Sequence, residues 1–410
     1  MSDHFSPKGA AAMHLSMWTY PWDVQDLSHD RVAGEFADAG LNTVSLATSY
    51  HAGRFLQPRS PRRKAYFPED GTLYFKPTPA RWEGLAIQPK LADVIRDGGD
   101  VLGELVRRRD AGGPAVSCWT VCLHNTRIGM LHPEVATRNA FGDPSYFSLC
   151  PSHPDARAYV TALVEDLSHA YRPDIIELES PSFMGFAHGY HHEKDGVGLT
   201  AEDDFLLSLC FCDACLARAA RSGIDGRRAR ERVKRWIAET CEREVPQPRW
   251  PDFPAAGLDV FKPYPDLHDY LTWRFEPVTS LIAEMRERTH PDTRLYLIDL
   301  KDGWLGGCDL AAAGAVCDGV ILCAYDMSPP QVTALLRGGR QAVGPDKFVG
   351  AGFRVFYPEM QGAADLVERV RAAAAAGADG LNFYNYGLIP QARLDWVRQA
   401  ISAAQEVHLG

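Results

Sequence analysis

The sequence has 410 residues, of which 46% are hydrophobic and 23% are charged, and these proportions are those of an ordinary globular protein. Its formal net charge of −10 argues against a nucleic-acid or membrane partner, because either would need a basic face. The N-terminus lacks the apolar core of a signal peptide, and no apolar run reaches the roughly 18 residues of a membrane span, which predicts a cytoplasmic protein.

Short apolar runs recur along the chain, and each is followed by a segment of helical periodicity. After the first run, for example, Val32, Phe36 and Ala39 lie at helical spacing and Gly40 is a helix stop signal. Apolar strands that alternate with helices indicate a parallel sheet covered on both faces. The runs lie at residues 12–20, 41–50, 115–125, 174–180, 293–300, 319–327, 348–356 and 380–387.

Eight strand–helix units in one chain predict an α/β fold of the (β/α)8 TIM-barrel type. The alternative is an open doubly wound sheet, which is disfavoured because no glycine-rich phosphate loop follows the first strand. A long segment, residues 181–265, separates the fourth strand from the helix before the fifth. We therefore expect residues 1–410 to form a single barrel domain with residues 181–265 as an insertion.

The C-terminal ends of the strands, where a (β/α)8 barrel places its active site, are rich in aromatic, carboxylate, amide and imidazole side chains. Aromatic faces stack on sugar rings and the polar groups bind hydroxyls, so the mixture favours a carbohydrate site; the alternative is that the aromatic residues only pack. The candidate substrate-binding residues are His14, Tyr20, Trp22, Tyr50, His51, Arg54, His124, Asn125, His188, His191, Trp304, Tyr325, Arg354, Asn382, Tyr384 and Asn385.

Cleavage of a glycosidic bond needs two carboxyl groups beside the bond. We predict Glu179 as the general acid/base, because it ends an apolar strand where a partly dry environment raises the pKa of a carboxyl; the alternative is a structural ion pair. Glu177 has the same parity and is expected to point into the barrel below Glu179. Asp326 is favoured as the nucleophile or base, and Asp299 and Asp302 follow.

Three cysteines, Cys210, Cys212 and Cys215, lie within six residues inside the insertion. In the cytoplasm thiols stay reduced, so such a cluster favours a metal site over disulfides. A redox role needs an exposed thiolate beside a positive group, which the acidic and apolar neighbours of these cysteines argue against. Zinc takes four tetrahedral ligands, so a structural zinc site would need one further, distant ligand.

The whole chain resembles the glycoside-hydrolase-like TIM barrels that include the family 42 β-galactosidases. The resemblance is carried by SLCPSHPDARAYV (148–160), by a glutamate at the end of the fourth strand and by CFCDAC (210–215). It implies that Glu179 is the acid/base and that a structural zinc ties the insertion to the loop after the third strand. The implied ligands are Cys150, Cys210, Cys212 and Cys215, with His153 or Cys241 as the alternative to Cys150.

Two positions depart from family 42. There the acid/base follows an asparagine, whereas Leu178 precedes Glu179 here, and FVGAGFRVFYPE (348–359) has no glutamate where that family has its nucleophile at the end of strand seven. CAYDM (323–327) on the sixth strand instead resembles the tyrosine–aspartate pair of chitinase-like barrels, in which the substrate's own N-acetyl group attacks.

The leading hypothesis is therefore a glycoside hydrolase that acts on a small saccharide or glycoside, with structural zinc and no organic cofactor. Whether the protein forms a homo-oligomer is left open. One alternative is a divalent-metal sugar isomerase or epimerase that uses Glu179, Asp299, Asp302 and histidines of HGYHHE (188–193) as ligands. The other is a barrel that only binds sugars.

Overall fold

The computed structural model describes residues 13–188 and 192–409, and its central feature is a closed barrel of parallel strands. The sheet closes because β1 pairs with both β2 and β13. The predicted (β/α)8 barrel is thus confirmed, and each of the eight predicted runs contains one barrel strand. These are β1 (His14–Thr19), β2 (Thr43–Tyr50), β6 (Ala115–Val121), β9 (Ile175–Glu179), β10 (Arg294–Asp299), β11 (Gly319–Cys323), β12 (Phe348–Arg354) and β13 (Gly380–Tyr384).

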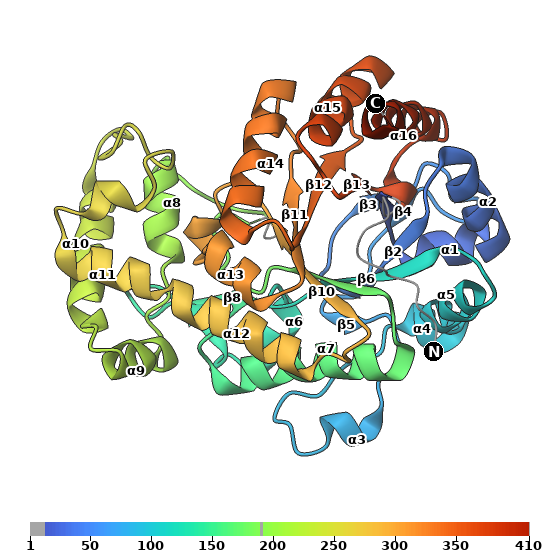
Figure 1. Cartoon of the computed structure of the whole chain (residues 1–410). Coiled ribbons are helices and arrows are strands. Elements are labelled where there is room, and N and C mark those ends of the chain that lie inside the picture. Colours follow the sequence, from blue (N-terminus) through green and yellow to red (C-terminus); the bar gives the residue numbers. More distant parts are fainter. Residues whose placement is uncertain (1–12, 189–191, 410) are drawn as a thin grey trace.

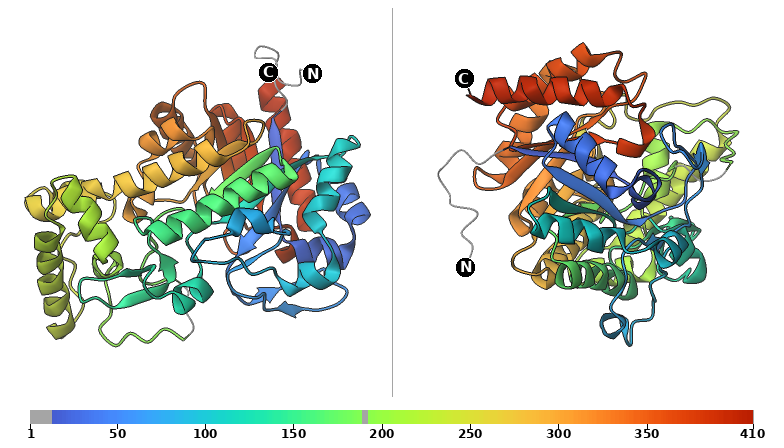
Figure 2. Two further views of the ribbon diagram at one scale, coloured as in Figure 1. Left: turned by 90° about the horizontal axis from the view of Figure 1, so that it is seen from below. Right: turned by 90° about the vertical axis from the view of Figure 1, so that its right-hand side faces the viewer.

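Helices surround the barrel and bury the outward faces of its strands (Figures 1 and 2). In α2 (His29–Ala39) the predicted residues Val32, Phe36 and Ala39 are the buried ones, and Gly40 ends the helix in the left-handed region at φ 79°. The other helices of this layer are α1 (Pro21–Leu27), α4 (Asp93–Gly98), α5 (Val101–Asp110), α7 (Pro154–Tyr171), α12 (Phe275–Arg288), α13 (Leu310–Val316), α14 (Pro329–Val343), α15 (Ala363–Ala375) and α16 (Arg393–Leu409).

Short elements decorate the loops that follow the strands. The loop after β2 carries a hairpin of β3 (Phe55–Leu56) and β4 (Ala65–Tyr66), then β5 (Thr72–Leu73), which pairs antiparallel with β2, and α3 (Pro79–Trp82). The loop after β6 carries α6 (Thr126–Leu131) and a second hairpin of β7 (Ala136–Arg138) and β8 (Pro144–Leu149). Two 3-10 helices, η2 (Gly303–Gly306) and η3 (Tyr386–Leu388), follow β10 and β13.

Between β9 and β10 the chain builds a group of helices that projects to one side of the barrel (Figure 1). They are α8 (Ala201–Ser208), α9 (Asp213–Arg221), α10 (Gly226–Glu242), η1 (Gly257–Phe261) and α11 (Pro265–Trp273). The helix α11 is followed almost directly by α12 of the barrel layer, so these two helices connect the projecting group back to the barrel (Figure 1). Among the described residues no helix combines the length and the apolar character that crossing a membrane requires.

Candidate active site and metal centre

Glu179 is the last residue of β9 and keeps part of its surface exposed at the C-terminal end of the barrel. Its Oε2 accepts a hydrogen bond from Nε1 of Trp119 on β6. Burial raises the pKa of Glu179 to about 7, the bond from Trp119 opposes that rise, and the charge of Glu177 adds to it. A carboxyl that still carries its proton near neutral pH, and that is reachable from outside, is suited to general acid catalysis.

Glu177 lies one layer below Glu179 in the barrel interior and is fully buried, where the sequence predicted it. Four neutral groups from four other strands donate to its carboxylate: Trp18 Nε1 at 2.7 Å, Ser45 Oγ at 2.8 Å, Ser117 Oγ at 2.7 Å and Asn382 Nδ2 at 3.4 Å. Asn382 was predicted to bind substrate, but it is fully buried and serves this interior network.

Three tyrosines from the ends of β1, β2 and β13 meet at the barrel mouth. The hydroxyl of Tyr20 donates to that of Tyr50 at 3.0 Å and lies 3.0 Å from that of Tyr384. Burial raises the pKa of all three phenols, so they stay neutral at physiological pH. Tyr20 and Tyr50 are buried and Tyr384 is partly exposed, so only Tyr384 offers its ring to a bound molecule.

The aspartate candidates differ in where they lie. Asp299, at the end of β10, is partly exposed, and burial raises its pKa to about 7 while the neighbouring charge of Asp302 adds to the rise. Asp326, the favoured candidate, is exposed, and its charge acts on Glu359 in the loop after β12. Asp299 therefore shares the desolvated environment of the strand ends, and Asp326 does not.

Glu179 and Asp299 flank a common neighbour. Both carboxyls act electrostatically on the buried thiol of Cys323 at the end of β11, whose pKa burial raises to about 12. Arg354, a potential ion-pair partner of Glu179, instead pairs with Glu359 at 3.0 Å, and its guanidinium lies 4.6 Å from the ring centre of Tyr325. Arg354 thus forms its ion pair with Glu359 and not with Glu179.

The predicted histidines form a ladder from the end of β2 towards the loop after β9. The ring of His51 stacks on Tyr50 at 4.3 Å and on His124 at 4.0 Å, and His124 meets His188 edge-on at 4.7 Å. Burial lowers the pKa of His124 to about 2, so its ring is neutral. His191, a further candidate, lies outside the described residues.

His14 and Trp22 were predicted at the mouth, and this was wrong. His14 is the first residue of β1, so its ring lies at the opposite end of the barrel, edge-on to Phe348 at 5.6 Å. Trp22 lies in α1 and is fully buried among rings that include Tyr20 at 4.4 Å and Phe55 at 5.6 Å. Both residues are of types that bind sugars. Neither lies at the mouth, because His14 begins its strand and Trp22 is buried in a helix.

Further candidates also have local structural roles. The side chain of Asn125 caps α6 by accepting from Ile128 N at 2.9 Å, and that of Asn385 caps η3 by accepting from Gly387 N at 3.1 Å. Trp304 packs on Phe205 of α8, and Arg54 is exposed to solvent. Asparagine is favoured in such caps because its side-chain oxygen replaces a missing backbone acceptor.

Residues that the sequence analysis missed hold the two glutamates. They are Trp18, Ser45, Ser117 and Trp119, which lie at alternate positions within apolar strands. Because side chains alternate across a strand, Ser117 and Trp119 point the same way, into the barrel. Polar atoms at alternate positions of a buried strand were therefore the available signal.

Four cysteines converge at the base of the insertion. Cys150 follows β8, and Cys210, Cys212 and Cys215 lie around the start of α9. The four Sγ atoms lie within 4.8 Å of one another and all four residues are buried. Sγ of Cys150 is 3.4 Å from Cys215, 3.5 Å from Cys212 and 3.9 Å from Cys210. Tetrahedral ligands with metal–sulfur bonds of about 2.3 Å would be about 3.8 Å apart, so the set fits a metal ion.

The surroundings of the cluster suit thiolate ligands. Backbone N–H groups of Arg138, Ser152 and Cys215 donate to Sγ of Cys210, Cys150 and Cys212 at 3.4, 3.4 and 3.5 Å. His153 and Cys241, the alternative ligands, do not join, because His153 caps α7 and Cys241 is exposed on α10. In the part of the chain that the structure describes, no other group of histidine, cysteine and carboxylate ligands converges in this way.

Arg274 connects the cysteine cluster with the loops at the barrel mouth. It is buried between α11 and α12, where the charges of cluster cysteines act on it. Its Nη2 donates to Leu305 O at 3.1 Å, in the loop after β10, and its guanidinium lies 4.7 Å from the ring centre of Phe183, in the loop after β9. A metal centre here would therefore brace the loops that follow both Glu179 and Asp299.

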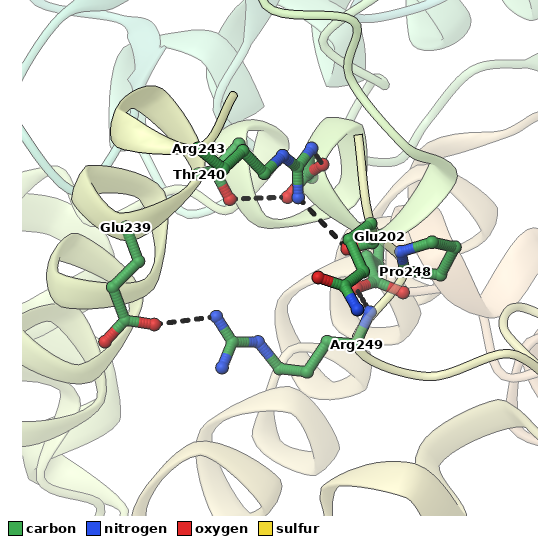
Figure 3. A pocket seen from close by; sticks show the side chains of 8 residues that line it. Glu202, Glu239, Thr240, Arg243, Pro248 and Arg249 are labelled. Atoms are coloured by element: carbon green, nitrogen blue, oxygen red, sulfur yellow. Dashed lines mark hydrogen bonds and ion pairs between the residues drawn. The ribbon is translucent and has the colours of Figure 1, made fainter. Parts of the chain in front are cut away.

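A separate cavity of about 330 Å³ lies within the insertion between α8, α10 and the segment 247–249 (Figure 3). Its charged groups already pair with one another. Arg243 bonds Asp203, Arg249 bonds Glu239 at 2.8 Å, and Glu202 accepts from the backbone. The cavity is thus lined by polar groups of the insertion and is separate from the barrel mouth.

Comparisons with solved structures find the same fold in glycoside-cleaving enzymes. An α-L-fucosidase from Paenibacillus thiaminolyticus is 12% identical with a TM-score of 0.53, and a β-galactosidase from Marinomonas ef1 is 14% identical with a TM-score of 0.54. Each match covers 96% of this chain, which spans 49% of the fucosidase chain and 59% of the galactosidase chain.

The catalytic domain of a β-amylase from Paenibacillus polymyxa matches over nearly its whole length. It is 10% identical with a TM-score of 0.54, and the match covers 95% of this chain and 98% of that chain. No family model matches the sequence, and neither does any curated protein. At these identities the comparisons establish the barrel fold.

Proposed function

We propose that the protein is a glycoside hydrolase that acts on a small saccharide or glycoside, with Glu179 as its general acid/base. The observation that carries the proposal is the position of Glu179, a partly exposed carboxyl at the end of the fourth barrel strand with a pKa of about 7. The names of the three similar enzymes support it, since a fucosidase, a galactosidase and an amylase all cleave glycosidic bonds.

In the proposed reaction Glu179 donates its proton to the oxygen of the leaving group. The second carboxylate either attacks the anomeric carbon or activates water, and it stabilises the positive charge that develops on the sugar ring. We propose Asp299 for this role ahead of Asp326, because Asp299 lies at a strand end and Asp326 is exposed in the loop beyond. The charge of Glu179 raises the pKa of Tyr384, so the two side chains are neighbours, and Tyr384 would contact the bound sugar.

The test of this function is turnover of a panel of aryl glycosides by the wild type and by Glu179→Gln. Aryl glycosides release a coloured phenol, so cleavage of any sugar in the panel is seen directly and names the sugar. Turnover of at least one member, lost in Glu179→Gln, is expected. Turnover that is equal in the two proteins would refute the role of Glu179.

We expect Asp299→Asn to lower kcat by about 10²–10⁴-fold and Asp326→Asn to change it by less than about 5-fold. The amide keeps the shape of each side chain and removes only its charge and basicity. The measurement is kcat for both variants on the best substrate of the panel. A larger loss of kcat in Asp326→Asn than in Asp299→Asn would assign the role of nucleophile or base to Asp326.

We further propose that the four cysteines hold one structural zinc ion. Four thiolates close the tetrahedral shell and leave no open position for substrate, so the ion would tie the insertion to the loop after β8 and supply no chemistry. Glu179, Asp299, Asp302 and the described histidines do not converge on a common point. This favours a hydrolase over a metal-dependent isomerase.

A further inference from the structure

We propose that Glu177 is a positioning residue, an ionised carboxylate inside the barrel whose charge controls the protonation of Glu179 one layer above. The inference deepens the proposed function and rests on it for its catalytic meaning. It concerns the interior network of Glu177, which the reaction itself does not touch.

The hydrogen bonds of Glu177 are those of a carboxylate. Its Oε2 receives Trp18 Nε1 and Ser45 Oγ, and its Oε1 receives Ser117 Oγ and Asn382 Nδ2. Indole and amide N–H groups can only donate, and each carboxyl oxygen of Glu177 receives one of them, which stabilises the ionised form. Burial raises the pKa of Glu177, and these four donors act against that rise.

The two glutamates form stacked pairs with two tryptophans. Side chains two residues apart on β9 point the same way, so Glu177 lies directly below Glu179. Trp18 donates to the lower carboxyl and Trp119 to the upper one, and their rings are 6.2 Å apart. An ionised Glu177 one layer below therefore raises the pKa of Glu179.

The phenols and thiols around the pair are neutral in the relevant pH range, whereas two chargeable groups lie nearby: Asp299, which acts on Cys323, and Arg354, which acts on Cys323 and Tyr384. Burial raises the pKa of each phenol and thiol that faces Glu179 from β2, β6, β11 and β13, and likewise that of the thiol beside Glu177. These groups are Tyr50, Cys122, Cys323, Tyr325, Tyr384 and, beside Glu177, Cys118. The charge of Glu177 therefore acts on Glu179 without compensation from them.

This arrangement would help to keep an acid catalyst protonated through a charge that lies inside the barrel, below the mouth. Four donors stabilise the ionised form of Glu177, and the charge of Glu177 raises the pKa of Glu179. The substrate would then bind above a protonated Glu179. The negative charge below Glu179 is that of Glu177, which is stabilised by four hydrogen-bond donors. The negative charge beneath the sugar would also favour the positive ring of the transition state.

The test is an NMR titration of the tryptophan indoles, which needs no substrate. The protein is labelled with ¹⁵N-tryptophan, and single Trp→Phe variants assign the indole resonances of Trp18, Trp119 and Trp273. Trp273 serves as the reference, because its Nε1 is buried without a hydrogen-bond partner. In the wild type the Trp119 resonance should titrate with a midpoint near pH 7, while that of Trp18 stays constant from pH 7 to 9. In Glu177→Gln the Trp119 midpoint should fall by about one pH unit.

A Trp119 midpoint that is unchanged in Glu177→Gln would overturn the inference. Should that variant fail to fold, the wild type alone decides, because a Trp18 resonance that titrates at or above the Trp119 midpoint would mean that Glu177 is the later group to ionise. Glu104→Gln on the surface of α5 is the control and should leave the midpoint in place. A confirmed shift with no turnover on the panel would retain the coupling and reject the hydrolase.

Discussion

Replacing Glu179 with glutamine is expected to lower kcat on an aryl glycoside by about 10²–10⁴-fold. The amide cannot give up a proton to the leaving group, but its oxygen can still accept the bond from Trp119, so the fold should survive. The loss should shrink on a substrate with a strongly acidic phenol, because such a leaving group departs without protonation. Steady-state kinetics on a nitrophenyl and a dinitrophenyl glycoside measure both effects.

The pH dependence of the wild type provides an independent check on the same residue. Because the pKa of Glu179 is raised to about 7, the protonated acid persists below that pH and is lost above it, so kcat/KM should fall on the alkaline side. Glu104→Gln, on the outside of α5, is the matched carboxyl-to-amide control and should retain the wild-type rate and profile. An unchanged rate in Glu179→Gln would remove Glu179 from the mechanism.

Cys212→Ser is expected to lower zinc content and stability together. Loss of one thiolate opens the tetrahedral shell, and the free energy of unfolding should fall by about 2–5 kcal/mol, since binding of a structural metal contributes directly to folding. Elemental analysis of the purified protein and its thermal unfolding measure the two quantities. The exposed Cys241 is the control position, and Cys241→Ser should keep both the zinc and the melting temperature.

A thiol count tests the same centre without mutation. Cys241 is exposed and the other nine cysteines are buried, so a thiol reagent should label one cysteine in the native protein. The four cluster cysteines should become reactive after chelation of the metal. A wild-type protein that contains no zinc and exposes ten reactive thiols would contradict the metal centre.

Much of the architecture could be predicted because it depends on local patterns. Apolar runs alternating with helical segments gave all eight barrel strands, since a strand buried on both faces must be apolar along its length. The same reasoning placed Glu179 at a strand end and Glu177 below it, because parity along a strand follows from its geometry. The spacing of Cys210, Cys212 and Cys215 likewise indicated a metal site.

The errors arose where a residue's role depends on its height along the barrel and on its neighbours. His14 and Trp22 have the chemistry of a sugar site, yet one lies at the far end of β1 and the other is packed behind it. Asn125 and Asn385 each satisfy the backbone at the start of a short helix, and their expected binding of substrate stays a prediction. Composition alone does not distinguish such caps from ligand-binding amides.

The sequence by itself determined the barrel, its strand order and the candidate acid Glu179, because hydrophobic periodicity reports burial one element at a time. Only the tertiary structure decided that Cys150 closes the cysteine cluster and that Asp299, rather than Asp326, shares the desolvated strand ends with Glu179. It also brought Trp18, Ser45, Ser117 and Asn382 onto Glu177 from four strands. Those contacts join residues far apart in the chain, and they form only when the sheet closes on itself.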